Sequence, residues 1–341
     1  MEASHMKLKI NPTIESAYKV LDGGELSFGE ALALTEIDGC DVLDLVSLAN
    51  KVRDKFAPEI TACAIINAKS GVCSQNCRFC AQAVAHHVDI ETYGLLDKEE
   101  IIAGAREAYN CGVRSYGIVT SGWGYKTLTP EFQRILDTLD ALGAEFPDMR
   151  KCVSIGILSD ECARLLAEHG ADRYNMNLQT SPARYAELIT AEHSIEEKIQ
   201  TIKSLQKYGV TICCGGIFGL GESWENRVEM AFACRELNAD GIPLNVLLPI
   251  KGTPLENLPV MQPADVAKAF SIFRLVNPTK MIKFAAGRET TMKDFQGLLM
   301  LAGVNAMITG GYLTTRGRSV EADKTFLSQL NLFTSNQPKS E

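Results

Sequence analysis

The chain has 341 residues and a net charge of −8, and 46% of its residues are hydrophobic and 22% charged. This is an ordinary globular composition, and a negative net charge argues against binding to nucleic acid or to an anionic membrane. No apolar run is long enough to span a bilayer and no signal peptide is visible, so we expect a cytoplasmic protein. Its eleven cysteines then indicate reduced thiols and metal binding rather than disulfides.

The first part of the chain is predicted to be helical. Residues 1–6 resemble an expression scar, and residues 7–57 form an N-terminal helical extension. Within it, Ser27-Phe28-Gly29-Glu30 is a capping box that predicts a helix start. Apolar residues at helical spacing from Asp41 to Lys55 predict a second helix. We expect this extension to cover one end of the domain that follows.

Residues 58–333 alternate between short apolar runs and helical patterns. The predicted strands are Thr61–Asn67, Ser115–Thr120, Lys151–Gly156, Arg173–Leu178, Val210–Ile217, Gly241–Leu247, Met281–Ala285 and Ala306–Thr309. The predicted helices between them are Leu96–Tyr109, Pro130–Gly143, Ser159–His169, Ser194–Tyr208, Trp224–Leu237, Pro263–Val276 and Lys293–Ala302. This alternation predicts parallel strands with right-handed crossovers, closed into a (β/α)8 TIM barrel. A doubly wound open sheet is the alternative, and the lack of G-x-G-x-x-G after the first strand weakens it. Residues 334–341 are polar, and we expect a disordered tail.

Three cysteines just after the first predicted strand are the most informative motif of the chain. Cys73, Cys77 and Cys80 stand at C-x3-C-x2-C spacing in a loop of Gly, Ser, Gln and Asn, with Phe79 between the last two. Thiolates this close in sequence bind soft metals or iron–sulfur clusters. Zinc usually requires a fourth ligand at a matching spacing, and none follows here. Three thiolates on a four-iron cluster leave one iron open for a small molecule. The alternatives are a zinc knuckle or three buried free cysteines.

Polar motifs follow the later strands, at the end where TIM barrels carry their chemistry. These motifs are Tyr174–Ser181, Cys213–Glu222, Pro243–Asn245, Ala286–Glu289 and Tyr312–Thr315. Asn175 and Asn177 are two residues apart, so they should face the same side of their strand. Burying an asparagine is costly unless its amide has a partner. One asparagine alone fits a satisfied internal network, but the set near one end favours contact with a ligand.

Together with the cysteine loop, these motifs resemble those of biotin synthase, over about residues 8 to 333. The resemblance rests on Cys73/Cys77/Cys80, Tyr174-Asn175-x-Asn177, Cys213-x-Gly215-Gly216, Gly219-Leu220-Gly221-Glu222, Asn245, Lys251-Gly252-Thr253-Pro254, Ala286-Gly287-Arg288-Glu289 and Leu313-Thr314-Thr315. It implies a radical S-adenosylmethionine (SAM) enzyme whose 5′-deoxyadenosyl radical removes hydrogen from unactivated carbons of dethiobiotin. A second, auxiliary iron–sulfur cluster deeper in the barrel then supplies the sulfur. The resemblance also implies an electron donor such as flavodoxin or ferredoxin, and a homodimer.

The resemblance implies roles for individual residues. Cys73, Cys77 and Cys80 would hold a 4Fe–4S cluster whose open iron chelates the amino and carboxylate groups of SAM. The residues implied to contact this cofactor are Phe79, Asn177, Gln179, His193, Gly216 and Ile217. The residues implied to contact the substrate are Asn175, Asn177, Asn245 and the backbone of Thr314 and Thr315. Gln179 stands where the family often has an aspartate for the ribose hydroxyls. His193 matches a residue that can meet the methionine carboxylate, and a solvated surface histidine is the alternative.

The auxiliary cluster is where the chain departs from the family's pattern. The better-known members hold it with three cysteines and an arginine. Cys152 and Cys213 match two of those cysteines, Gly117 replaces the third, and Lys283 replaces the arginine. Cys63 stands where those members have a serine. Either the cluster is lost and the reaction differs, or it is rebuilt on three cysteines from strands one, three and five, which share a barrel layer. Three thiolates suit a four-iron rather than a 2Fe–2S cluster, with an open iron for an extra sulfide. The alternative is that all three are small core residues.

Two other functions stay open from the sequence. One is another radical SAM enzyme of the same branch, a mutase or a cofactor-maturation protein that transfers no sulfur. The other is a non-catalytic iron–sulfur or zinc protein. The iron and sulfide content per chain separates all three possibilities.

Overall fold

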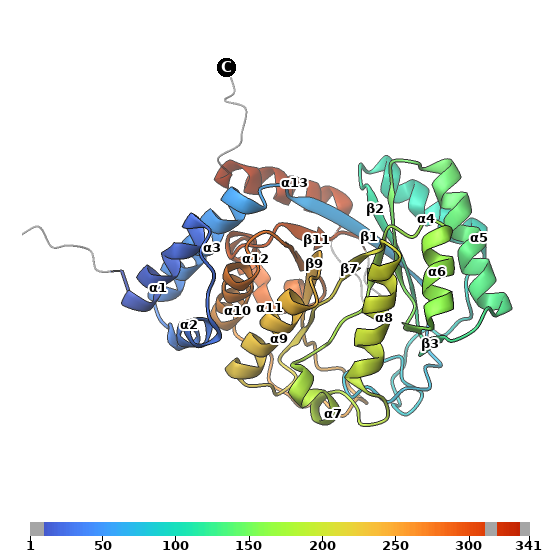
Figure 1. The fold of residues 1–341 in the computed structure, drawn as a ribbon, viewed down its shortest axis with the longest axis horizontal. Coiled ribbons are helices and arrows are strands. Elements are labelled where there is room, and N and C mark those ends of the chain that lie inside the picture. The colour runs from blue at the N-terminus through green and yellow to red at the C-terminus, as the bar shows by residue number, and fades with distance from the viewer. Residues whose placement is uncertain (1–9, 311–318, 335–341) are drawn as a thin grey trace, which may run out of the picture.

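The computed structural model of the protein describes residues 10–310 and 319–334. Its centre is a ring of parallel strands: β1 (Thr61–Lys69), β2 (Ser115–Thr120), β4 (Arg150–Ser154), β6 (Arg173–Asn175), β7 (Thr211–Cys213), β9 (Gly241–Val246), β10 (Met281–Phe284) and β11 (Ala306–Ile308). The ring closes because β11 pairs with both β1 and β10, and β10 also pairs with β9. The prediction of a (β/α)8 TIM barrel is confirmed (Figure 1).

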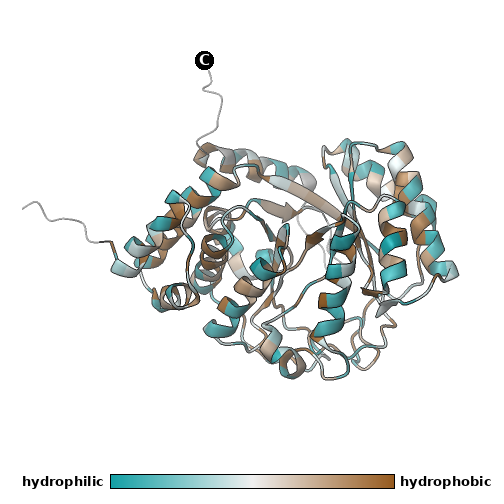
Figure 2. Ribbon diagram, in the orientation of Figure 1, coloured by the Kyte–Doolittle hydropathy of each residue, from teal (hydrophilic) through white to brown (hydrophobic). Residues whose placement is uncertain are grey.

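Helices surround the ring, and their positions agree with the predicted ones. They are α4 (Lys98–Asn110), α5 (Pro130–Glu145), α6 (Asp160–Glu168), α8 (Ile195–Lys207), α9 (Trp224–Glu236), α10 (Pro263–Val276) and α12 (Gln296–Leu301). Side-chain caps fix several starts: the backbone N–H of Cys162 donates to Ser159 Oγ at 3.2 Å, and that of Phe132 donates to Thr129 Oγ1 at 3.1 Å. Hydrophobic residues lie in the strands and on the inner helix faces (Figure 2). Within the described ranges, no helix is long and apolar enough to cross a membrane.

The N-terminal extension contains α1 (Pro12–Ala17), α2 (Phe28–Ala33) and α3 (Asp41–Phe56). The predicted capping box is present, since Glu30 Oε2 accepts from the backbone of Ser27 at 2.8 Å and Ser27 Oγ accepts from that of Glu30 at 3.3 Å. The expectation that the extension covers one end of the barrel is wrong, because it packs along the outer side, against α9, α10 and α12 (Figure 1). The reason is that residues 266–276 of α10 are buried all round, so this helix requires a second apolar layer outside it.

Two predicted strands are shorter than expected because glycines interrupt them. Strand three ends at Ser154, and Gly156 turns the chain with φ +87°. Residues 157–158 then form β5 (Ile157–Leu158), which pairs with β3 (Gly124–Tyr125) in a small sheet of its own. Strand five ends at Cys213, and a Cβ atom on Gly215 would lie 2.0 Å from the carbonyl oxygen of Pro243. The chain resumes as β8 (Gly216–Phe218), which pairs with β9.

The remaining elements are α7 (Tyr185–Leu188), α11 (Arg288–Met292) and α13 (Val320–Leu330). A buried ion pair at 2.9 Å joins Arg288 of α11 to Asp323 of α13. The predicted scar at residues 1–6, and residues 335–341 of the predicted tail, lie outside the described residues.

Candidate functional site

A cavity of about 470 Å³ extends from the C-terminal ends of the strands into the barrel. The cysteine loop after β1 lines its upper part, and all eight strands of the ring contribute residues to its wall. All predicted site residues within the described ranges line this cavity except Gly216, which precedes the lining residue Ile217. Thr314 and Thr315 lie outside the described residues. The cavity contains two sets of cysteines, one on the loop and one on the strands.

The loop set is Cys73, Cys77 and Cys80. A sharp turn begins the loop, with φ +72° at Gly71 and φ +51° at Val72, and Ser121 Oγ donates to the carbonyl of Gly71 at 2.6 Å. The backbone N–H of Cys73 donates to the carbonyl of Gln82 at 3.0 Å, which folds the loop back on itself. Burial raises the pKa of Cys77 to about 12 and also raises that of Cys80. These sulfurs are therefore thiols at neutral pH until a bound metal centre stabilises the thiolates.

The spacing of the sulfurs bears on which metal centre fits. In the part of the chain that the structure describes, no three His, Cys, Asp or Glu side chains converge as the ligands of one metal ion would. A zinc knuckle requires such convergence. The cysteines of a four-iron cluster instead bind different irons and stand farther apart. Three thiols of one short loop at the wall of a cavity could hold a cluster of this kind.

His193 lies directly behind the loop set. Its Nε2 is 3.6 Å from Cys77 Sγ, its Nδ1 is 3.1 Å from the Tyr185 hydroxyl, and its ring centroid is 4.1 Å from that of Trp123. Burial, followed by the charge of Lys198, lowers the pKa of His193 to about 4, so the ring is neutral at neutral pH. Both ring nitrogens already have protein partners. The role of His193 toward a carboxylate stays a prediction, and the alternative of a solvated surface histidine is wrong because the residue is only 8% exposed.

Lys198 is a cavity residue that the sequence reasoning missed. Its Nζ donates to the carbonyl of Asn177 at 3.0 Å and lies 5.1 Å from the centre of the Tyr185 ring. Burial lowers the pKa of Lys198 to about 8, although the neighbouring Cys77 opposes the shift. A signal was present in the sequence, because Lys198 stands in the buried stripe of α8 with Ile195, Ile202 and Leu205. Burying a lysine is costly unless its ammonium group has partners, so a lysine in an apolar stripe indicates a functional site. Here it brings a positive charge to the cavity.

The predicted polar contacts come from β6, from the segment directly after it, and from β9. Asn245 is held on both sides, since its Nδ2 donates to the carbonyl of Gly216 at 3.1 Å and its Oδ1 accepts from the backbone of Ala286 at 2.9 Å. Asn177 Oδ1 accepts from the backbone of Gly215 at 3.2 Å. Asn175 makes a longer contact, from its Nδ2 to Ser154 Oγ at 3.4 Å. These bonds fix the orientation of each amide at the cavity wall.

Gln179 has the geometry of a ligand-binding residue. Its backbone has φ +74°, a left-handed conformation that is rare for a residue other than glycine. Two bonds to the glycine segment hold it there: its N–H donates to the carbonyl of Gly215 at 3.1 Å, and its carbonyl accepts from Ile217 at 2.8 Å. Its side-chain Oε1 is buried and has no hydrogen-bond partner among the residues that the structure describes. Such an atom in a cavity wall fits a ligand that brings a hydroxyl group.

The strand set lies deeper in the cavity. Cys63, Cys152, Cys213 and Lys283 stand on β1, β4, β7 and β10, the first, third, fifth and seventh strands of the ring. Alternate strands of a TIM barrel contribute the four side chains of one layer. Cys63, Cys152 and Cys213 therefore face the barrel axis together with an ammonium group. Cys214 packs in the outer core instead, as the alternation along a strand predicts.

The charges of this layer depend on each other. Burial, the largest effect, would raise the pKa of Cys63, but Lys283, Ser115 and Arg173 together outweigh it and lower this pKa overall. Burial would likewise lower the pKa of Lys283, but the three cysteines Cys63, Cys213 and Cys152 together raise it overall. The pKa of Cys152 is raised to about 11, first by burial and then by the Cys63 charge. The layer thus favours a negative charge on Cys63 beside the Lys283 ammonium, and it keeps Cys152 as a thiol that a metal centre could deprotonate.

Two further residues of this region were missed. Ser115 Oγ lies 3.3 Å from Cys152 Sγ, and Arg173 lines the cavity while its Nε donates to Thr211 Oγ1 at 3.2 Å. Each stands two residues before a position that the sequence reasoning considered, Gly117 and Asn175 respectively. The two-residue period of a strand would have placed both on the inner face.

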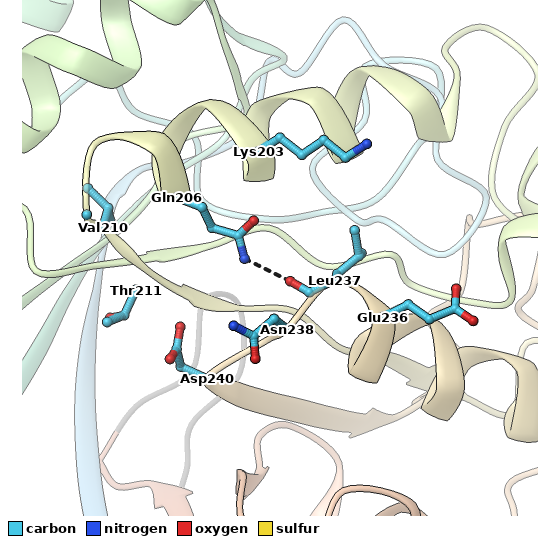
Figure 3. A pocket seen from close by; sticks show the side chains of 9 residues that line it. Lys203, Gln206, Val210, Thr211, Glu236, Leu237, Asn238 and Asp240 are labelled. Carbon is cyan, nitrogen blue, oxygen red and sulfur yellow. Dashed lines mark hydrogen bonds between the residues drawn. The ribbon is translucent and has the colours of Figure 1, made fainter. Parts of the chain in front are cut away.

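A second hollow of about 450 Å³ lies at the opposite ends of β7 and β9. Figure 3 shows its lining, where Gln206 Nε2 donates to the carbonyl of Leu237 at 2.8 Å. None of the predicted site residues lines it. The candidate chemistry is therefore in the barrel cavity.

Comparison with known proteins gives two domain matches and close relatives. Residues 68–234 match the Radical SAM superfamily, and residues 243–333 match the Biotin and Thiamin Synthesis associated domain. The chain is 52% identical over 333 residues to a biotin synthase of Chlorobaculum parvum, which covers 96% of this chain and 100% of that protein. It is 52% identical over 331 residues to a biotin synthase of Pelodictyon phaeoclathratiforme, which covers 95% and 98%.

Two solved structures share the fold. Methylornithine synthase has a TM-score of 0.79 at 19% identity, over 93% of this chain and 95% of that one. The FeFe-hydrogenase maturase of Carboxydothermus hydrogenoformans has a TM-score of 0.76 at 18% identity, over 93% and 78%. At these identities the comparison shows a shared fold and nothing about function.

Proposed function

The chain belongs to the biotin synthase family of radical SAM enzymes, and we propose that the two cysteine sets of its cavity divide the work of inserting sulfur into dethiobiotin. The reaction is that of a sulfurtransferase that forms biotin, as the family membership establishes. The loop set would hold the radical SAM 4Fe–4S cluster, and the strand set would hold the auxiliary cluster. When bound, the first cluster and SAM supply the radical that activates carbon, and the second cluster supplies sulfur.

One observation carries this assignment. Cys63, Cys152 and Cys213 share a barrel layer with Lys283, beneath the loop cysteines and in the same cavity. The substrate would lie between the two sets, so that one end of the cavity acts on its carbons while the other delivers sulfur. Three thiolates with one ammonium suit a four-iron auxiliary cluster with an open iron better than a 2Fe–2S cluster, because Gly117 offers no ligand and a lysine must lose a proton to bind iron.

The upper wall of the cavity suits SAM. Phe79 and Ile217 line this wall and would bound the adenine, with Gly216 directly before Ile217 in the chain. The Oε1 of Gln179, which has no partner among the described residues, would accept from a ribose hydroxyl. Lys198 is the better-placed cation for the methionine carboxylate, since both nitrogens of His193 face protein groups. This assignment gives His193 a different role, which is developed below.

The polar amides would hold dethiobiotin. Asn177 and Asn245 present amide groups of fixed orientation near the middle of the cavity, where the ureido ring offers matching donors and acceptors. Asn175 would contribute from the same strand end. The backbone of Thr314 and Thr315, outside the described residues, would take the carboxylate tail. We further propose a cytoplasmic homodimer that receives electrons from flavodoxin or ferredoxin.

The test is anaerobic reconstitution with iron and sulfide, followed by iron counting and assay with dethiobiotin. About eight irons per chain are expected for two four-iron clusters, and about four would leave the radical cluster alone. Cys63→Ser should keep SAM binding, lose close to half of the iron and stop biotin formation. Cys40→Ser is the matched control, because this exposed cysteine lies outside the cavity. Full iron and normal biotin formation in Cys63→Ser would show that Cys63 is only a core residue.

A further inference from the structure

His193 is held in one orientation by three different segments of the chain. Cys77 comes from the loop after β1, Trp123 from the turn after β2, and Tyr185 from the first residue of α7. The Trp123 ring packs at 4.1 Å and fixes the plane of the imidazole, and the Tyr185 hydroxyl at 3.1 Å fixes its rotation. This leaves Nε2 directed at Cys77 Sγ, 3.6 Å away and 116 residues distant in sequence. A buried imidazole with both nitrogens engaged is a built contact rather than a chance approach.

The bonding partners determine which nitrogen carries the proton. A cysteine that binds iron is a thiolate, and its sulfur can only accept a hydrogen bond. Nε2 must then carry the hydrogen, which leaves the lone pair of Nδ1 to accept from the Tyr185 hydroxyl. Burial raises the pKa of Tyr185, so this hydroxyl keeps its proton and can donate. Tyr185 therefore selects the tautomer of His193 that donates to Cys77.

We propose that His193 is a positioning residue of the radical centre, whose Nε2–H···Sγ bond to Cys77 raises the reduction potential of the cluster that this cysteine binds. The inference rests on the proposed function, because it requires the loop set to hold the 4Fe–4S cluster. Reduction adds one electron to the cluster from a low-potential donor, and no bond at His193 is formed or broken. The reduced cluster carries more negative charge, so it gains more from a donated hydrogen bond than the oxidised cluster does.

The loop itself makes this contact distinctive. Burial raises the pKa of Cys80, and the backbone N–H groups of Gln82 and Ala83, in the same loop, oppose that shift. These backbone N–H groups are present whenever the loop is folded. The donor to Cys77 is a side chain from a distant segment, so it adjusts the cluster without altering the loop that holds it.

The experiment is an anaerobic redox titration of the reconstituted full-length protein, with the reduced cluster measured by electron paramagnetic resonance. His193→Phe keeps an aromatic ring against Trp123 but removes the donor. At a fixed solution potential we expect its ratio of reduced to oxidised cluster to fall about tenfold, which equals 59 mV for a one-electron couple. His193→Gln retains an N–H at similar reach and should recover part of the loss. Tyr185→Phe should shift the ratio in the same direction by less, because the favoured tautomer is then no longer enforced.

A control variant separates this effect from general loosening of the core. Tyr116→Phe removes another buried hydroxyl, which donates to the carbonyl of Ile101 at 3.1 Å outside the cavity, and it should leave the ratio unchanged. An unchanged ratio in His193→Phe with full iron content overturns the inference. If His193→Phe loses its iron, the test passes to Tyr185→Phe. An unchanged ratio of reduced to oxidised cluster in Tyr185→Phe, with full iron content, also overturns the inference. Failure of the proposed function looks different, since the loop cluster would then be absent from the unmodified protein as well.

Discussion

The loop set and the strand set of cysteines share one cavity, but they are built in opposite ways. The loop set spans eight residues, from Cys73 to Cys80, and any chain that makes the turn at Gly71 brings its sulfurs together. The strand set spans residues 63 to 283 and exists only because alternate strands of a closed ring point at the same axis. The loop set is therefore a local motif, and the strand set is a property of the whole fold.

The two sets also differ in charge. Burial raises the pKa values of Cys77 and Cys80, so neither of these two thiols is ionised at neutral pH. In the strand set, Lys283 lowers the pKa of Cys63 despite complete burial. On the proposed assignment, a cluster that turns over electrons and one that gives up sulfur would thus begin from different electrostatic surroundings. Each of the following changes should affect one set and spare the other.

The largest effect is expected from Cys77→Ala. Loss of this thiolate removes one of three ligands of the radical cluster, so reductive cleavage of SAM should fall to the background rate. The strand set should still take up its iron, because none of its side chains comes from the loop. Cleavage is measured as 5′-deoxyadenosine formed with dithionite. Normal cleavage by this variant would contradict the assignment of the loop set.

Lys283→Met should have the next largest effect, and only on the strand set. Methionine fills a similar volume but leaves three thiolates and an anionic cluster without their buried counter-charge, a loss on the order of 3–5 kcal/mol. Iron content should fall toward that of the radical cluster alone, while SAM binding is kept. Lys283→Arg is the matched control and should retain most of the iron, since it keeps the positive charge. Equal iron in both variants would show that charge does not hold this site together.

The smallest effect is a difference in thiolate content of the metal-free protein. A cysteine with a lowered pKa is ionised at a lower pH than usual, whereas one with a raised pKa stays protonated. At a pH just below the usual range for cysteine, the ultraviolet thiolate absorbance should therefore drop in Cys63→Ser and be unchanged in Cys77→Ala. As the pH falls, the thiolate signal of the unmodified protein should disappear below the usual range for cysteine. A larger drop in thiolate absorbance in Cys77→Ala than in Cys63→Ser would contradict the stated difference in charge between the two sets.

Much of the barrel was predictable because its signals are local. Ser115–Thr120 and Pro263–Val276 match the observed strand and helix at both ends, and the Ser27–Glu30 capping box is present. The break in strand five was missed, because the close approach of Gly215 to Pro243 is a contact between strands that no local pattern reveals. The extension was misplaced for a similar reason, since the fully buried surface of α10 depends on what packs against it.

The site was predictable to the extent that it follows from motifs or from strand alternation. The cavity brings together the predicted Cys63, Cys152, Cys213 and Lys283. The resemblance to the family indicated these positions, and the strand order with the layer rule supported their grouping. Lys198 was missed although its place in a helical apolar stripe marked it as buried. The contact of His193 with Cys77 was beyond prediction, because it depends on how three loops meet.

The packing of the extension on the barrel also sets the order in which the protein can mature. Lys268 Nζ donates to the carbonyls of Thr35 and Ile37 at 2.9 Å, across more than 230 residues, and Asn305 Nδ2 donates to that of Ala57 at 3.2 Å. At the speed of a ribosome, the first helices wait roughly 10 to 50 s for these partners to be synthesised. The three loop cysteines leave the ribosome early, whereas the strand set lacks Lys283 until most of the chain is made. On the proposed assignment, loading of the sulfur-donating centre would therefore be a step for the finished polypeptide. A truncated chain that ends before β10 would acquire the first centre but not the second.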